Sequence, residues 1–226
     1  YNDLPGYLTP ATSARVVSIG ATTVFTGVYV RTFGTCGIND YSGAGLSDMA
    51  VYDEATGCWF ARTPAGAVPV WDMLWGGSGS VPVPGDYDGD GVADLAVFNT
   101  LTGGWFIKTV SGTTLAWNFA WGWPGATPVW GDYDGDKPSD LAAFDNHTGY
   151  WYVWSLTAGT LVWRENWGWA GANTVPGDYD GDMLSDMAMF DEGTARWYVW
   201  SLARGEILAD FAWGWPGCRV VGACGQ

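Results

Sequence analysis

The stretch Gly85-Asp86-Tyr87-Asp88-Gly89-Asp90-Gly91-Val92-Ala93-Asp94 places four aspartates at positions one, three, five and nine, counted from Asp86. A hard cation such as Ca²⁺ takes about six to eight oxygen ligands, and alternate residues of a turning backbone can supply them. The glycines allow the positive φ angles that wrap a chain around an ion. The stretch therefore predicts a cation-binding loop.

The same pattern recurs at a fixed spacing along the chain. Intact copies lie at 131–140 (GDYDGDKPSD) and 177–186 (GDYDGDMLSD), and a degenerate copy lies at 39–48 (NDYSGAGLSD). The first aspartates are Asp40, Asp86, Asp132 and Asp178, a constant step of 46 residues. Tryptophans follow the same step in four columns: 59/105/151/197, 75/121/167/213, 71/117/163 and 123/169/215. This register indicates a structural unit that makes the same contacts in each copy.

Each unit contains four short segments with strand character. In the second unit they span 81–84, 94–98, 105–110 and 113–119, and they are rich in β-branched and aromatic residues. Turn-forming residues separate them at 99–104 and 111–112, and a linker at 121–125 leads to the next unit. No amphipathic helical pattern of useful length is present. We therefore predict an all-β fold.

Four strands in a unit of this length are typical of a β-propeller blade, with a stacked solenoid as the competing architecture. We place the repeats at about 36–81, 82–127, 128–173 and 174–219. Residues 219–222 resemble a first strand, whereas residues 2–4 resemble a loop exit and 14–19 and 22–32 resemble strands. Closing a ring removes exposed sheet edges. We therefore predict a single domain, 1–226, forming a five-bladed propeller of four-stranded antiparallel blades, whose fifth blade combines 220–226 with 1–35.

The motifs VPGDYDGD, DLAVF and GWFI, followed by a Trp-Gly linker, resemble the FG-GAP/VCBS type of propeller repeat. This type occurs in integrin α-chain heads and in many secreted bacterial proteins. The resemblance covers about 36–219 and implies about three Ca²⁺ sites, each with four aspartates and one backbone carbonyl. The implied ligands are Asp86, Asp88, Asp90, Val92 and Asp94; Asp132, Asp134, Asp136, Pro138 and Asp140; and Asp178, Asp180, Asp182, Leu184 and Asp186.

Two departures from the pattern carry expectations of their own. The degenerate copy keeps Asp40 and Asp48, has Ser42 at the third position and lacks an acid at the fifth, so we expect a weak site or none. Lys137 and Met183 occupy the sixth position, where glycine is the easiest residue, so we expect those two loops to be slightly strained.

The chain carries a formal net charge of −15. This charge argues against nucleic-acid binding, which depends on Lys and Arg neutralising phosphates. Twelve of the 24 acidic residues lie in the three intact loops, so much of the acidity is explained by metal binding. No uninterrupted apolar run is long enough for a membrane span. The chain starts at Tyr1 without Met, as expected for a processed protein.

The four cysteines, Cys36, Cys58, Cys218 and Cys224, lack the spacing of a zinc or redox site. Both disulfides and loops that need abundant Ca²⁺ favour an extracellular setting. We therefore expect a secreted or cell-surface protein with two disulfides. Cys36–Cys58 with Cys218–Cys224 is one pairing, and a bridge between the two pairs that joins the chain ends is the other.

Catalysis requires groups with tuned pKa values at one site. The only histidine, His147, lies in a predicted turn, and no nucleophile accompanies it. Outside the loops, no acid pair is distinctive enough for glycoside hydrolysis. We therefore expect a non-catalytic protein, with a glycoside hydrolase or polysaccharide lyase as a minor alternative.

The linker tryptophans Trp123, Trp169 and Trp215 occupy connections between units, where loops often carry function. Exposed indole faces bind sugar rings by stacking, and repeated weak sites gain from avidity. The leading hypothesis is a multivalent, lectin-like binder of glycans or another extracellular surface component. The alternative is a structural or adhesive subunit that self-assembles, or an accessory domain of a larger secreted protein.

Overall fold

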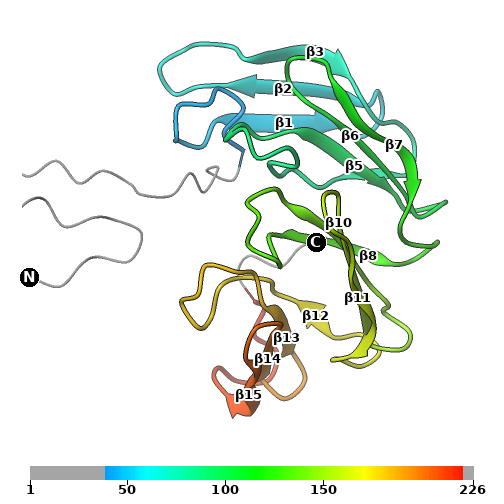
Figure 1. Ribbon diagram of the computed structural model, residues 1–226, viewed down its shortest axis with the longest axis vertical. Helices are drawn as coiled ribbons and strands as arrows, with labels where there is room; N and C mark the ends of the chain where they lie inside the picture. The colour runs from blue at the N-terminus through cyan, green and yellow to red at the C-terminus, as the bar shows by residue number, and fades with distance from the viewer. Residues whose placement is uncertain (1–38, 221–226) are drawn as a thin grey trace, which may run out of the picture. The chain divides into compact units, whose positions relative to one another are not determined.

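The computed structural model describes residues 39–220, and within them it contains fifteen β-strands and no helix (Figure 1). The strands form four antiparallel sheets, so the predicted all-β class is confirmed. Three sheets have four strands and the first has three. The residues at the repeat position of a first strand in that sheet, 35–38, lie outside the described residues. In 39–220 we find no helix with the length and apolar character needed to cross a membrane.

Within each sheet the strands are hydrogen-bonded in sequence order. The first sheet contains β1 (Met49–Asp53), β2 (Cys58–Arg62) and β3 (Val70–Leu74). The second contains β4 (Ser80–Pro82), β5 (Leu95–Asn99), β6 (Gly104–Lys108) and β7 (Thr114–Ala120). The third contains β8 (Thr127–Gly131), β9 (Asp140–Phe144), β10 (Tyr150–Ser155) and β11 (Gly159–Asn166). The fourth contains β12 (Asn173–Thr174), β13 (Met187–Asp191), β14 (Arg196–Ser201) and β15 (Gly205–Ala212). The four strands predicted for the second unit correspond to β4–β7 with small shifts at their ends.

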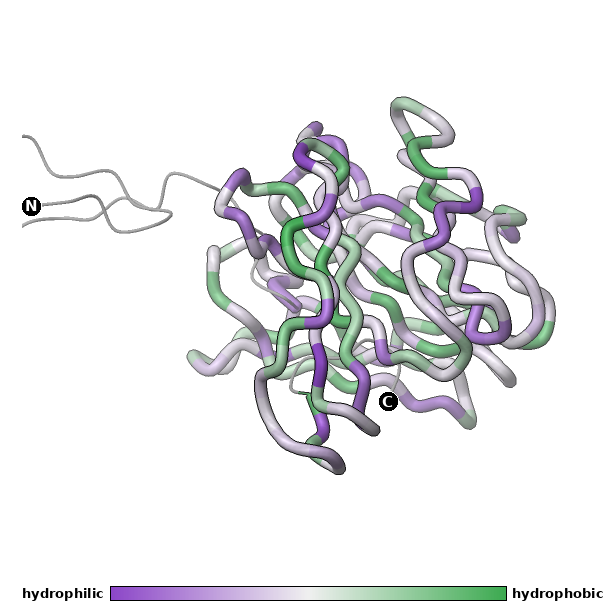
Figure 2. The backbone as a smooth tube through the Cα atoms, turned by 90° about the horizontal axis from the view of Figure 1, so that it is seen from below, coloured by the Kyte–Doolittle hydropathy of each residue, from purple (hydrophilic) through white to green (hydrophobic). Residues whose placement is uncertain are grey.

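The second strand of each four-stranded sheet lies in the core. β5, β9 and β13 are buried at nearly every position, which explains why LAVF, LAAF and MAMF are continuous apolar runs rather than alternating ones. Hydrophobic and hydrophilic stretches alternate along the backbone (Figure 2). Each of these strands also packs against the sheet before it: Leu95 joins the cluster of Trp59 and Trp75, and Leu141 joins that of Trp105 and Trp121. Successive sheets therefore share their cores face to face.

The two terminal sheets each keep one uncovered face among the described residues. Met49 and Val51 are 59 % and 64 % exposed, whereas the equivalent Leu95 and Val97 of the next sheet are fully buried. At the other end Trp213 is 72 % exposed, whereas the equivalent Trp121 is 8 % exposed. The predicted fifth blade, 220–226 plus 1–35, lies outside the described residues except for residue 220.

The predicted disulfides fall largely outside the described range as well. Cys58 and Cys218 are half-buried and form no disulfide with each other within 39–220. Their candidate partners Cys36 and Cys224 lie outside the described residues. Both pairings therefore stay predictions.

Candidate metal centres

Each intact aspartate loop connects the first and second strands of its sheet, and the degenerate loop precedes β1. We name the loops by their repeats: loop 1 (40–48), loop 2 (86–94), loop 3 (132–140) and loop 4 (178–186). Strand pairing closes the base of each intact loop. In loop 2 the Asp94 N–H donates to the Gly85 carbonyl at 2.7 Å, and in loop 4 the Asp186 N–H donates to Gly177 at 2.8 Å. In loop 3 Gly131 pairs with Asp140 at the ends of β8 and β9. This pairing places the ninth-position aspartate close to the first-position aspartate of the same loop.

The first-position aspartate organises the turn. In loop 2 the two carboxylate oxygens of Asp86 accept hydrogen bonds from the backbone N–H groups of Gly89 (2.7 Å) and Gly91 (2.8 Å). Asp132 and Asp178 receive the same pair of bonds from the equivalent residues of loops 3 and 4. These bonds explain why the glycine-rich spacing of the sequence forms one compact turn in all three copies.

The sixth position adopts a left-handed backbone in every intact copy. Its φ is +86° at Gly91, +89° at Lys137 and +73° at Met183. Residues with a Cβ are disfavoured there by roughly 1–2 kcal/mol. The expected strain at Lys137 and Met183 is therefore confirmed by their backbone conformation.

The turn brings most of the predicted acidic ligands together. In each intact loop, carboxylate oxygens of three aspartates lie within 4.8 Å of one another. The clusters are Asp86, Asp88 and Asp90; Asp132, Asp134 and Asp136; and Asp178, Asp180 and Asp186. The predicted ligands Asp94, Asp140 and Asp182 lie outside these clusters. The seventh-position residues Val92, Pro138 and Leu184 lie on the same loops, two residues before the ninth-position aspartate.

The ninth-position aspartates are buried at the base of these clusters. Burial, with a smaller contribution from the neighbouring carboxylates, raises the pKa of Asp94 and of Asp140 to about 7 and that of Asp186 to about 6. One oxygen of each accepts a 2.8 Å hydrogen bond from the backbone N–H of the tyrosine at the second loop position. The pKa shifts show how poorly these sites tolerate the charge in the absence of a counterion.

The other oxygen of two of these carboxylates has no donor. Asp140 Oδ1 and Asp186 Oδ1 are buried and accept no hydrogen bond from any described residue. Leaving a buried acceptor unsatisfied costs about 1–3 kcal/mol, and more for a charged group. A cation in the adjacent cluster would satisfy these oxygens, and an all-oxygen donor set suits Ca²⁺ rather than a softer metal. The residues present therefore fit the ion that the resemblance implies.

The carboxylates of loop 1 accept hydrogen bonds from other groups of the same loop. The Ser42 hydroxyl lies 3.1 Å from a carboxylate oxygen of Asp40 and 3.3 Å from one of Asp48. Asp40 also accepts from the N–H groups of Ala44 and Gly45, and Asp48 accepts from that of Ser42. The hydroxyl thus occupies the place where the other loops carry a third carboxylate, and loop 1 forms none of the three-carboxylate clusters found in 39–220. This arrangement agrees with the weak site expected there.

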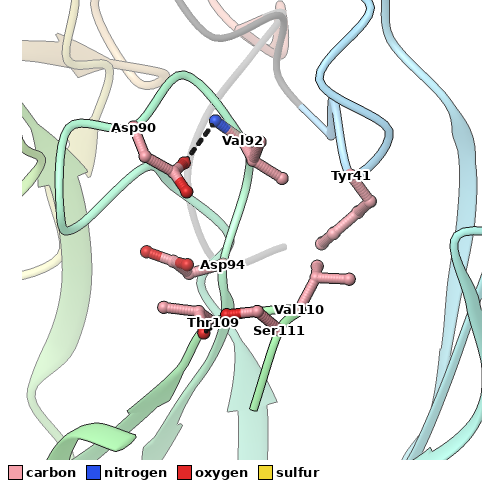
Figure 3. Close-up of a pocket in the computed structure, with 7 residues that line it drawn as sticks. All are labelled: Tyr41, Asp90, Val92, Asp94, Thr109, Val110 and Ser111. Carbon is pink, nitrogen blue, oxygen red and sulfur yellow. Dashed lines mark hydrogen bonds between the residues drawn. The ribbon is translucent and has the colours of Figure 1, made fainter. Parts of the chain in front are cut away.

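A pocket of about 280 Å³ adjoins loop 2 (Figure 3). The Asp90 and Asp94 side chains lie on one side, Tyr41 lies on the opposing side, and Thr109 and Ser111 come from the turn that precedes β7. In the next two sheets the equivalent turns reach the loops: Thr157 donates to Asp136, and Arg204 lies 3.4 Å from Asp180. Two of the loop 2 aspartates therefore line this pocket.

The linker tryptophans occupy two different environments. Trp123 and Trp169 are half-buried and pack edge-on against Tyr152 and Tyr198 of the next sheet, with ring centroids 4.9 Å and 4.8 Å apart. Trp215 is exposed. His147 is an exposed residue of the turn between β9 and β10, with Nδ1 3.7 Å from Asp145. The first two linker rings therefore contribute to packing between sheets.

A different column, which the sequence alone did not single out for binding, is the one in which every tryptophan is exposed. These residues are Trp71, Trp117 and Trp163. Their 46-residue spacing is visible in the sequence, but their exposure depends on the arrangement of the sheets.

No family model, curated protein or solved structure matches this chain. The resemblance to FG-GAP/VCBS repeats therefore rests on the loop and repeat residues themselves. The function of the chain is accordingly inferred from the geometry of its loops and of its exposed rings.

Proposed function

We propose that this chain is a non-catalytic, calcium-stabilised binding module of the β-propeller type that works outside the cell and binds carbohydrate. The observation that carries the calcium assignment is the pair of buried, donor-free oxygens of Asp140 and Asp186. Asp186 belongs to the carboxylate cluster of loop 4, and Asp140 lies on the same loop as the cluster of Asp132, Asp134 and Asp136. A bound cation would complete the set of partners that these loops lack.

The ion would have a structural role. Each loop joins two adjacent strands, so the aspartates on it hold those strands in register only when their mutual repulsion is offset. An ion that binds the folded chain alone stabilises it by about 2.7 kcal/mol per site at a hundredfold excess over Kd. Loops with a bound ion would thus stabilise the pairing of β5, β9 and β13 with the strand before each of them.

Calcium titration of the full-length, metal-depleted chain tests this role. We expect about three equivalents of Ca²⁺ by isothermal titration calorimetry and a marked rise in melting temperature that a chelator reverses. Asp140→Asn should remove one equivalent, whereas Asp48→Asn, at the same position of loop 1, should remove none. A melting temperature unaffected by Ca²⁺, with no binding heat, would exclude the calcium assignment.

We further propose that five sheets close a ring, with 220–226 and 1–35 forming the fifth. The two uncovered end faces support this arrangement. Met49 and Val51 at one end and Trp213 at the other are equivalent to residues that are buried or half-buried wherever two described sheets meet. A fifth sheet would bury both faces and remove the exposed ends of the array.

Carbohydrate is the ligand class that best fits the surface. Solvent-exposed indole rings recur once per sheet in the first three sheets, and the net charge of −15 disfavours anionic ligands. A broad glycan array, probed with Ca²⁺ and again with chelator, tests this class. A blank array from folded, Ca²⁺-loaded protein would refute carbohydrate binding, and hydrolysis or cleavage of a bound glycan would instead reveal a glycoside hydrolase or polysaccharide lyase.

A structural subunit is the second candidate, and the same end faces favour it. The Met49 face of one copy could cover the Trp213 face of another and so continue the array from chain to chain. Analytical ultracentrifugation distinguishes the self-assembling subunit from the closed ring. Concentration-dependent polymers would support the subunit, whereas a monomer at all concentrations would support the closed ring.

A further inference from the structure

One tryptophan lies exposed on the edge strand of each of the first three sheets. These residues are Trp71 of β3, Trp117 of β7 and Trp163 of β11, which are 74 %, 70 % and 69 % exposed. They occupy the same position of the repeat, and the fourth sheet has Ala209 there. Burying an indole is strongly favourable, so three indoles left in water at one repeated position require an explanation.

The backbone next to each of these rings is strained in the same way. The following residues, Asp72, Asn118 and Arg164, have φ values of +52°, +49° and +62°. The pairing of each edge strand with its neighbour shifts register in the same region. Such a β-bulge redirects side chains, and bulges are over-represented beside functional sites. Left-handed backbone costs most at Arg164, because arginine lacks the short polar side chain with which Asn and Asp hydrogen-bond locally.

Neighbouring aromatic side chains hold these rings in place. Trp117 meets Phe106 edge-on at 5.4 Å and Trp75 of the preceding sheet at 5.5 Å. Trp163 meets Tyr152 at 5.3 Å and Trp121 of the preceding sheet at 5.7 Å. Rings fixed in this way lose little rotamer freedom when a ligand covers their exposed surface. Trp71 has only Phe60, at 5.4 Å, among the described rings.

Taking carbohydrate binding as given, we propose that Trp117 and Trp163 are the sugar-stacking platforms of this protein and that Trp71 is a weaker third. A neutral pyranose presents an apolar C–H face that matches an indole, and its hydroxyls would meet the exposed polar residues beside the ring. Asn118 follows Trp117, and Arg164 and Glu165 follow Trp163. The acidic surface disfavours polyanionic glycans, so the ligand class is a neutral oligosaccharide.

The repeat places one platform on each successive sheet. A single stacked ring binds weakly, but platforms on adjacent sheets can engage one polysaccharide or several chains of one surface. The linker rings Trp123 and Trp169 are already engaged with Tyr152 and Tyr198, so they offer less free surface.

Calorimetric titration of the full-length, Ca²⁺-loaded chain with cellohexaose, chitohexaose, maltohexaose and laminarihexaose tests this proposal. For whichever hexasaccharide binds, we expect Trp117→Ala and Trp163→Ala each to weaken affinity at least about tenfold, which corresponds to about 1.4 kcal/mol. Trp215→Ala is the comparison variant, because it removes a tryptophan of the linker column, the competing candidate for the sugar site. Melting temperature with and without Ca²⁺ verifies that each variant folds.

A second measurement needs no variant. Hydroxyl-radical oxidation of the wild-type chain, mapped by peptide mass spectrometry, should show Trp117 and Trp163 protected by the saturating hexasaccharide. Unchanged affinity in both variants would overturn the platform assignment but leave carbohydrate binding standing. Loss of binding in Trp215→Ala would then assign the sugar site to the linker column. If the wild-type chain binds glycans on the array but none of the neutral hexasaccharides, the neutral-sugar assignment is wrong and carbohydrate binding stands. If the array is also blank, both the neutral-sugar assignment and carbohydrate binding are wrong.

Discussion

The backbone N–H of Ser139 donates a 2.5 Å hydrogen bond to the carbonyl oxygen of Asp86 across the interface between two sheets. Asp86 occupies the first position of loop 2, and Ser139 immediately precedes Asp140, which occupies the ninth position of loop 3. Ser185 makes the equivalent bond to Asp132 at 2.6 Å, and Ala93 makes it to Asp40 at 2.7 Å. Neighbouring loops are therefore joined through their own backbones.

This connection predicts that calcium binds cooperatively. An ion that orders loop 2 fixes the Asp86 carbonyl and so preorganises the segment of loop 3 that carries Asp140. Coupling between sites is commonly about 1–3 kcal/mol. We expect a Hill coefficient above one in a calorimetric Ca²⁺ titration, and Asp140→Asn should weaken binding at both remaining sites. Asp186→Asn, at the end of the described series, should affect only one neighbour. Remaining sites with unchanged affinity in both variants would contradict the coupling.

The tryptophan that begins each third strand is predicted to be a main source of stability. The Trp105 indole N–H donates to the Trp121 carbonyl at 2.6 Å, and the ring is fully buried. Trp105→Phe leaves that carbonyl without its donor, which costs about 1–3 kcal/mol, and leaves a cavity in addition. We expect urea unfolding of the Ca²⁺-loaded protein to show at least this loss. Trp117→Phe, at an exposed position, should change stability by less than about 0.5 kcal/mol. Equal losses in the two variants would contradict this assignment.

Glycine at the sixth loop position is predicted to relieve strain. Lys137→Gly and Met183→Gly should each stabilise the chain by about 0.5–1 kcal/mol, because the left-handed penalty of roughly 1–2 kcal/mol exceeds the entropic cost of glycine. The reverse change, Gly91→Lys, isolates the backbone effect, since a Cβ at Gly91 meets no atom within 4 Å. It should destabilise by a similar amount in urea denaturation. Stabilisation by Gly91→Lys would show that the side chain, rather than the backbone, decides stability at this position.

The calcium-free protein is predicted to lose stability as pH rises from about 4 to above 7. The pKa values of Asp94 and Asp140 are raised from 3.8 to about 7 in the folded chain, and that of Asp186 to about 6. The folded state therefore binds more protons than the unfolded state in this window, so the free energy of unfolding decreases with pH.

Urea midpoints in chelator at about pH 5 and about pH 7.5 measure this dependence across the window set by the raised pKa values. The Asp94→Asn/Asp140→Asn double variant should have a flatter profile, because its amides do not titrate. Saturating Ca²⁺ should stabilise the wild-type chain more at the higher pH, where it does not compete with protons. Calcium-free protein that is more stable at the higher pH would contradict the assignment of these buried carboxylates.

The repeat made much of this structure predictable. The loops, the strand boundaries and the left-handed sixth position follow from local spacing and turn chemistry, which are encoded within one unit. The exposure of Trp117, the packing of Trp123 on Tyr152 and the bond between Ser139 and Asp86 depend on how two sheets meet. These contacts join residues from different units, and a single unit's sequence contains no information about its neighbour's orientation.

The uncovered end faces lead to the last prediction, which concerns ring closure. Trp213 and Met49 are exposed when only 39–220 are considered, as is Trp117 on the edge strand β7. If 220–226 and 1–35 supply a fifth sheet, Trp213 and Met49 of the monomeric chain should resist hydroxyl-radical oxidation, whereas Trp117 should react readily. If a second copy covers the faces instead, protection should appear only as protein concentration rises. A buried ring or thioether is shielded from the radical, and an exposed one is not. If Trp213 and Met49 are oxidised as fast as Trp117 at every concentration, the faces of the two terminal sheets are therefore covered neither by a fifth sheet nor by a second copy.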